Sequence, residues 1–334
     1  MIAGGRHAFQ VLHPGSPMLR VRYRAGIVVD AHGFPDWVPF ARAVVQLPPV
    51  RDDLGAHANR VVDVLAANRV VAGTDPLHED APTGGGPAGW TWAHLPVVTP
   101  GAPRRAALVP IELHGAHRHL GGVSTARTDR TRRYLGEPGR WPVPSRVEAT
   151  VADDALTKVE EHLGRALPAD YRQYLRDSNG GGPHVAVVHV GLGFVADQPM
   201  FGVARPDALQ DLLYANAWFG DRFTADYVAA GYVQGGLIAV KVRGEATGSV
   251  WWFDDDDPRA KDDDTAEDVC ERLLHHCADD FKAFWQMLCE PPEPLRAAAA
   301  AADVTQLHPD RMGAALPAAK RPTGPQPASG GATR

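Results

Sequence analysis

The sequence predicts a two-domain chain of the α+β class. The length of 334 residues exceeds one ordinary hydrophobic core, 44% of the residues are apolar, and helix-like and strand-like stretches are mixed in both halves. The segment 136–145 (GEPGRWPVPS) holds three prolines and two glycines, so we place the domain boundary there. We expect an N-terminal extension (1–30), a first domain (31–135), a linker (136–147), a second domain (148–290) and a low-complexity tail (291–334).

The first domain is predicted to contain short strands and two helices. Residues 19–24 alternate apolar and basic side chains, as in a strand. Between residues 58 and 68 apolar side chains recur every three or four positions, which predicts a helix that stops at Gly73. The loop 81–89 (APTGGGPAG) precedes a predicted strand, turn, apolar strand (106–109) and helix that stops at Gly121–Gly122.

The second domain is predicted to be a mixed sheet flanked by helices. An amphipathic helix spans about 151–163 and ends at Gly164, and a second runs from Pro168 to the turn 179–183. Residues 184–203 and 237–253 have strand-like composition, and 266–289 is predicted to be a final helix. After Pro291 the sequence is rich in Ala, Pro and Gly, and we predict that residues 297–334 form a mostly disordered tail.

Charge is divided unevenly between the two halves. Residues 1–147 hold 17 basic residues, all arginine, against 11 acidic ones, whereas residues 148–290 hold 12 basic and 26 acidic residues. The first half therefore carries a net charge of +6 and the second −14. This asymmetry indicates contact with nucleic acid or mutual attraction of the halves.

We expect a cytoplasmic protein that does not contact a membrane, because neither a signal peptide nor a run of about 18 apolar residues is found. Cys270, Cys277 and Cys289 are odd in number, and the first two would share a helix face. We interpret all three as buried, reduced thiols.

Histidines cluster in the basic half. His94, His114, His117 and His119 lie within 26 positions, with His94 on a predicted strand and His114 opening the predicted helix. Imidazole near neutral pH is a general base or a metal ligand, so the cluster indicates metal-assisted phosphodiester chemistry; surface and capping histidines would give the same count. The strand–turn–strand–helix order is the layout of a ββα-metal nuclease.

Three strings carry a family resemblance: GWTWAHLP (89–96), LVPIELH (108–114) and HLGGVS (119–124). They resemble the HNH/endonuclease VII-type toxin nucleases, in particular the branch with a Trp-His-His motif. GFPD (33–36) and the spacing of Asp63, Ala67 and Asn68 are similar to the family's lead-in, so the resemblance covers about residues 30–128.

The resemblance implies a small ββα-metal-like domain that cleaves DNA with one divalent cation, Mg²⁺, Mn²⁺ or Zn²⁺. His94 would be the general base, and His114 and His119 would be metal ligands. On one helix His119 would lie roughly 140° around from His114, so both reach one metal only if the helix ends first, for which Gly121–Gly122 is a signal. His117, on the same face as His114, is the competing ligand.

The chain departs from the family pattern at Ala93, which stands at the first His of the dyad and offers a metal no lone pair. Loss of one of three protein ligands weakens metal binding severely. We therefore expect catalysis in this domain to be impaired or absent.

The acidic half resembles a second family. VEEHLGRALPADYRQYL (159–175) and SNGGGP (178–183), with matches at 200–203, 235–239, 248–254 and 281–285, are similar to the SUKH (Smi/Knr-type) superfamily, whose bacterial members are mostly immunity proteins. This resemblance covers about residues 148–290. It implies an α+β domain that binds a toxin nuclease.

An acidic run follows the last predicted strand. Asp254, Asp255, Asp256 and Asp257 form either a solvated loop, a weak cation site without the EF-hand spacing, or phosphate mimics that attract a basic nuclease. Trp251 and Trp252 alternate on that strand, so one belongs to the core and the other contacts a partner. We take Trp252 and the four aspartates as the candidate partner-binding residues.

Three functions follow from the pairing. The chain is a self-neutralised toxin–immunity fusion of a polymorphic toxin system, held together in part by its short tether. Alternatively, the nuclease part has lost its chemistry and the chain neutralises a separate toxin nuclease in trans. The third function is a metal-dependent DNA endonuclease regulated by its fused SUKH domain. Because of Ala93 we rank immunity-type binding first.

Overall fold

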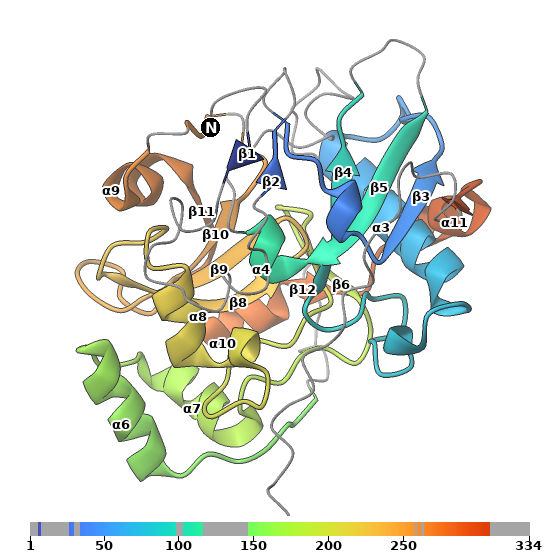
Figure 1. Ribbon diagram of the computed structural model, residues 1–334. Coiled ribbons are helices and arrows are strands. Elements are labelled where there is room, and N and C mark those ends of the chain that lie inside the picture. Colours follow the sequence, from blue (N-terminus) through green and yellow to red (C-terminus); the bar gives the residue numbers. More distant parts are fainter. Residues whose placement is uncertain are drawn as a thin grey trace, which may run out of the picture.

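The computed structural model describes residues 6–7, 27–29, 34–97, 103–115, 146–257, 259–261 and 264–307. Helices and antiparallel sheets are mixed in it, which confirms the predicted α+β class. Figure 1 shows the sheet of the first half and the larger sheet of the second half on opposite sides of the molecule. Within the described part of the chain, no helix has the length and apolar character to cross a membrane.

A long helix on a four-stranded sheet forms the first half. The sheet order is β13-β3-β5-β4, in which β13 (Thr305–Leu307) comes from the C-terminal end of the described chain, and every neighbouring pair is antiparallel. The elements are β3 (Ala43–Leu47), α3 (Ala56–Ala72), β4 (Trp90–Leu95), β5 (Arg104–Pro110) and α4 (Ile111–His114), with a short pair β1 (Arg6–His7) and β2 (Ile27–Val28) and 3-10 helices at Val38–Phe40 and Pro76–His78.

The structure confirms the predicted elements of the first half where it describes them. The helix expected at 58–68 lies within α3, which begins after Gly55 and ends at Gly73. The strand–turn–strand–helix order is present, since β4 pairs with β5 and α4 follows directly, but His114 is the last residue of α4 and does not open the helix as expected. The strand expected at 19–24 and the stop at Gly121–Gly122 lie outside the described residues.

The second half packs helices against two antiparallel sheets, ordered β11-β10-β9-β8 and β12-β6-β7. Its elements are α6 (Asp153–Leu163), α7 (Ala169–Ser178), β6 (Val187–His189), β7 (Val195–Ala196), a 3-10 turn (Ala208–Gln210), α8 (Leu212–Trp218), β8 (Tyr227–Val233), β9 (Gly236–Lys241), β10 (Val250–Asp254), α9 (Ala266–Asp268), a π-helical turn (Val269–Leu273), β11 (Leu274–Ala278), α10 (Phe281–Gln286) and β12 (Leu288–Cys289).

The first two helices of this half are confirmed. Gly164 and Asn179, with φ of 66° and 50°, end α6 and α7 in the left-handed conformation that terminates helices. The expected mixed sheet is wrong for the described strands, because all their pairings are antiparallel.

The final helix predicted over 266–289 is also wrong. Its middle, Leu274–Ala278, is strand β11, which pairs with the edge of β10. The apolar spacing in this stretch fits a helix, but the unpaired edge of β10 offers backbone hydrogen bonds that outweigh local preference. Cys270 and Cys277 therefore do not share a helix face: Cys277 is buried, whereas Cys270 and Cys289 are half-buried, and all three are free thiols.

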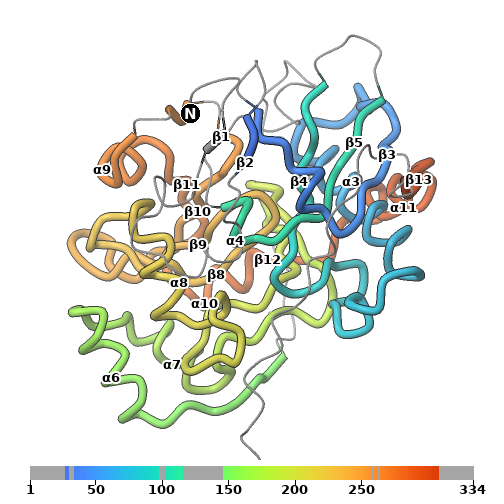
Figure 2. Tube along the Cα trace, in the orientation of Figure 1, coloured from blue at the N-terminus to red at the C-terminus, as the bar shows by residue number. Residues whose placement is uncertain are grey.

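The expected tail begins too early, because residues 293–307 belong to the fold. Helix α11 (Glu293–Ala301) packs on α3, and β13 (Thr305–Leu307) pairs antiparallel with β3. Figure 2 shows this C-terminal stretch beside the N-terminal β3 and α3. The alanines of α11 read as low complexity in sequence, yet Ala298 and Ala299 allow α11 to approach α3 closely.

Both hydrophobic cores cross the boundary between the halves. One face of the first sheet, with Val45, Trp92 and Leu108, joins α3, α11 and strands β6 and β7 of the second half. The opposite face, with Val44 and Ala93, joins the core of the second half. The chain therefore crosses from the first half to the second and returns, and the two halves share their packing.

Candidate nuclease site covered by the second half

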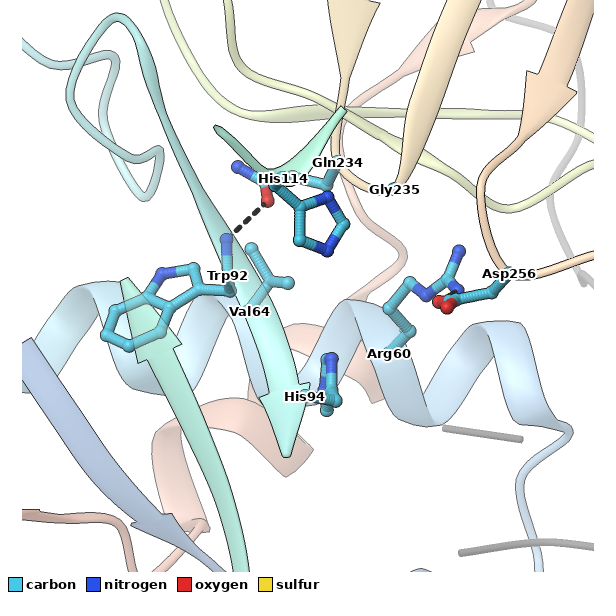
Figure 3. Close-up of a pocket in the computed structure, with 8 residues that line it drawn as sticks. All are labelled: Arg60, Val64, Trp92, His94, His114, Gln234, Gly235 and Asp256. Carbon is cyan, nitrogen blue, oxygen red and sulfur yellow. Dashed lines mark hydrogen bonds and ion pairs between the residues drawn. The ribbon is translucent and has the colours of Figure 1, made fainter. Parts of the chain in front are cut away.

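Residues from both halves line one small pocket. His94 comes from β4, His114 from α4 and Arg60 from α3, while Gln234, Gly235 and Asp256 come from the second half; Val64 and Trp92 complete the lining. Figure 3 shows Arg60 directed toward Asp256, with His94 and His114 around the same opening. The structure therefore brings together two of the three predicted site histidines. His119 and its competitor His117 lie outside the described residues.

An acidic side chain of α3 orients His94. Its Nε2 lies 3.1 Å from Oδ2 of Asp63, and Asp63 also forms an ion pair with Arg104 of β5. When Nε2 donates its hydrogen to the carboxylate, Nδ1 of the neutral ring is left as the basic nitrogen. This contact fixes the orientation of the His94 ring. The sequence shows that Asp63 lies on a helix, but not that it contacts His94, because the two residues are 31 positions apart.

Ala93 does not face the pocket. Successive strand residues point to opposite faces, so Ala93 lies on the far side of β4 from His94, where it is 1% exposed among apolar side chains. A ligand at position 93 would thus enter the shared core rather than the pocket.

The described residues do not fit a divalent cation. Among them no group of three or more His, Cys, Asp or Glu side chains is arranged to hold a metal ion. His94 is held by Asp63, and Nδ1 of His114 lies 3.2 Å from the hydroxyl of Tyr232.

The acidic run at 254–257 lies against this site instead of forming a solvated loop. Asp256 and Asp254 form ion pairs with Arg60, the second at 3.6 Å between Oδ1 and Nη1, and the Arg60 side chain is 4% exposed. Oδ2 of Asp255 accepts a hydrogen bond from Tyr232 at 3.1 Å and lies 3.7 Å from Nδ1 of His114. Burial of these carboxylates corrects the expectation of a solvated loop.

The last aspartate anchors the loop. Asp257 contacts Nε2 of His275 at 2.9 Å and the guanidinium of Arg259 at 2.7 Å. Burial opposes the charge of Asp257, but the hydrogen bonds from His275 and Arg259 outweigh it and hold its pKa below the ordinary value. The charged loop is therefore fixed in the position where it meets Arg60 and His114.

Trp252 is not an exposed partner contact. It is 0% exposed, and its ring meets that of His57 on α3 at 5.8 Å in an edge-on arrangement. Trp251 is the half-buried member of the pair. Four of the predicted partner-binding residues thus contact the first half of the same chain, namely Trp252, Asp254, Asp255 and Asp256, whereas Asp257 contacts Arg259 and His275 of the second half.

A buried polar network that the sequence did not reveal closes the interface. Asp197 accepts hydrogen bonds from the backbone N–H of Gly86 at 2.8 Å and from Nε2 of Gln234 at 3.0 Å. Oε1 of Gln234 in turn accepts from the Thr91 hydroxyl at 2.8 Å and from the Trp92 N–H at 3.1 Å. Burial raises the pKa of Asp197 to about 6, against the lowering effect of these hydrogen bonds.

The fold and the site define an HNH-like ββα domain docked on a second α+β domain. Comparison with protein families agrees: residues 82–129 match the nucleases of the HNH/ENDO VII superfamily with conserved WHH, and residues 150–286 match the SMI1/KNR4 family (SUKH-1). Both family resemblances seen in the sequence are confirmed, and their pairing implies a polymorphic toxin context. No curated protein matches the chain. Arg60 and Asp63 lie outside the matched nuclease segment.

Proposed function

We propose that the protein is an immunity-type binding protein of a bacterial polymorphic toxin system. Its SUKH domain is docked in cis on a WHH nuclease domain that has lost its activity. One observation carries this proposal: the buried ion pairs of Arg60 with Asp254 and Asp256, beside His94 and His114. We also propose that the protein acts in the cytoplasm, a reducing compartment in which its three free cysteines would stay thiols.

Complementary charge supports docking in cis. The first half is basic and the second is acidic, and the acidic loop meets a buried arginine of the first half. The Arg60 guanidinium and the Asp254 and Asp256 carboxylates are all removed from water, so each charge is stabilised by its partner. Separating the two halves would leave the charge of Arg60 uncompensated. DNA that approaches the pocket meets carboxylates, which repel its phosphates.

The metal-binding side chains available in the pocket support a loss of nuclease activity. Position 93 carries no metal-binding side chain, and because it faces the shared core it supplies no ligand to the pocket. Among the residues that the structure describes, His94 and His114 belong to no group of three or more side chains that could hold a metal ion.

A second candidate function is a DNA endonuclease that the SUKH domain regulates. The observation that favours it is the His94–Asp63 pair, which keeps a general base oriented in the pocket. This function requires the acidic loop to leave Arg60 and His114 when DNA binds.

Plasmid nicking by the full-length chain in Mg²⁺, Mn²⁺ or Zn²⁺ tests the proposal. We expect no cleavage by the unmodified chain and none by His94→Ala. Cleavage that His94→Ala abolishes would overturn the proposal and establish the regulated endonuclease. Binding in trans is tested separately by calorimetry of the full-length chain with a WHH nuclease domain of the same class.

A further inference from the structure

We infer that Arg60 is the phosphodiester-binding residue of the nuclease half and that the Asp254 and Asp256 carboxylates occupy the place of a backbone phosphate. The inference rests on the proposed function, since it assigns the ligand that the acidic loop imitates. It goes beyond the family match, because Arg60 lies outside residues 82–129.

The position of Arg60 supports this role. Arg60 lies one helical turn before Asp63 on α3, and it lines the same pocket as His94 and His114. A phosphate held by Arg60 would therefore lie beside both histidines. An arginine in this position can bind two phosphate oxygens at once through its planar fork of N–H donors.

The partners of Arg60 come from the other half of the chain. Within the described residues, both of its ion pairs reach across the interface to Asp254 and Asp256, whereas the carboxylate beside His94 belongs to the nuclease half itself. The nuclease half thus presents a buried cation whose counter-charge the SUKH half supplies. A carboxylate and a phosphodiester share the oxygen geometry that a guanidinium recognises.

The second half is shaped for close approach to this guanidinium. Gly235 has φ of +80°, and a Cβ there would lie 2.9 Å from Nη1 of Arg60. A side chain at position 235 would be strained and would also push the arginine away. The turn between β8 and β9 and the acidic loop therefore enclose Arg60 together.

The test measures thermal unfolding of the full-length Asp254→Asn/Asp256→Asn variant in inorganic phosphate, in dimethyl phosphate, and in chloride at matched ionic strength. Without phosphate, the uncompensated arginine should lower the unfolding temperature by roughly 5–10 °C. Both phosphates should restore part of this loss, because a ligand that binds only the folded state stabilises it. Dimethyl phosphate represents the diester of a nucleic-acid backbone.

Two triple variants serve as matched controls. Adding Arg60→Gln should abolish the phosphate effect, and adding Arg105→Gln, at an exposed arginine of the same half, should preserve it. A phosphate effect of equal size in both triple variants, or none in the double variant, would overturn the inference; rescue by inorganic phosphate without dimethyl phosphate would overturn the diester assignment. If the double variant does not fold, Asp256→Asn alone is used. The readout is independent of cleavage, so it fails or succeeds separately from the proposed function.

Discussion

Two of the contacts that cover the nuclease half differ in kind. On one side α11 and β13 cover α3 and the edge of β3 with small apolar side chains and backbone pairing. On the other side the acidic loop covers Arg60 and His114 with charge. The apolar contact completes the fold, whereas the charged contact lies on the site. In the sequence, the SUKH domain is inserted between two segments of the domain that it covers, because α11 and β13 follow it and pack on α3 and β3.

The apolar contact should have the largest effect when it is removed. A chain that ends at Glu290 loses α11 and β13, which exposes α3 and leaves β3 as an open edge. We expect the free energy of unfolding to fall by about 3–6 kcal/mol, a large share of ordinary domain stability. Urea unfolding measures it. The matched control ends at Leu307, and equal stability of the two chains would show that the contact contributes nothing.

The charged contact should be strongly coupled. Arg60→Met and Asp256→Asn should each cost about 3 kcal/mol, because each leaves a buried charge without its partner, and the double variant should cost less than the sum. A double-mutant cycle by chemical denaturation gives the coupling free energy. Additive effects of the two substitutions would mean that the ion pair does not hold the interface.

The Ala93→His variant tests whether a histidine at position 93 would reach the pocket or enter the packed core. Because position 93 faces the packed core, we expect the imidazole to overfill it and to lower stability by about 1–3 kcal/mol. The variant should still not nick plasmid in Mg²⁺, Mn²⁺ or Zn²⁺. Cleavage by Ala93→His that depends on His94 would show instead that residue 93 reaches the pocket.

The buried network at Asp197 should respond to pH. The folded-state pKa of about 6 lies above the ordinary value near 4, so folding favours the protonated carboxyl. This group therefore adds stability as the pH falls from about 7 to about 4, by about 1–3 kcal/mol. His189, whose pKa burial lowers to about 4, acts in the opposite direction over the same range. The difference between wild type and Asp197→Asn isolates the contribution of Asp197, and parallel pH profiles would refute it.

The sequence predicted the local elements better than their partners. The spacing of apolar residues in 58–68 predicts α3, and the order of strands and turns around His94 and His114 predicts the ββα unit. Both predictions succeed because these features depend on residues close together in the sequence. The helix expected at 266–289 failed because β10 supplies a pairing edge from elsewhere in the chain. The burial of Trp252 and the acidic loop, and the network at Asp197, depend on contacts between halves that no local pattern encodes.

DNA binding tests whether the acidic loop occludes the pocket in cis. Fluorescence anisotropy of a labelled duplex with the full-length chain, in EDTA at low salt, measures whether Arg60 is accessible. We predict that Arg60→Gln leaves the anisotropy of the duplex unchanged, because the acidic loop already occupies this residue. Binding by the unmodified chain that Arg60→Gln abolishes and Arg105→Gln preserves would contradict the claim.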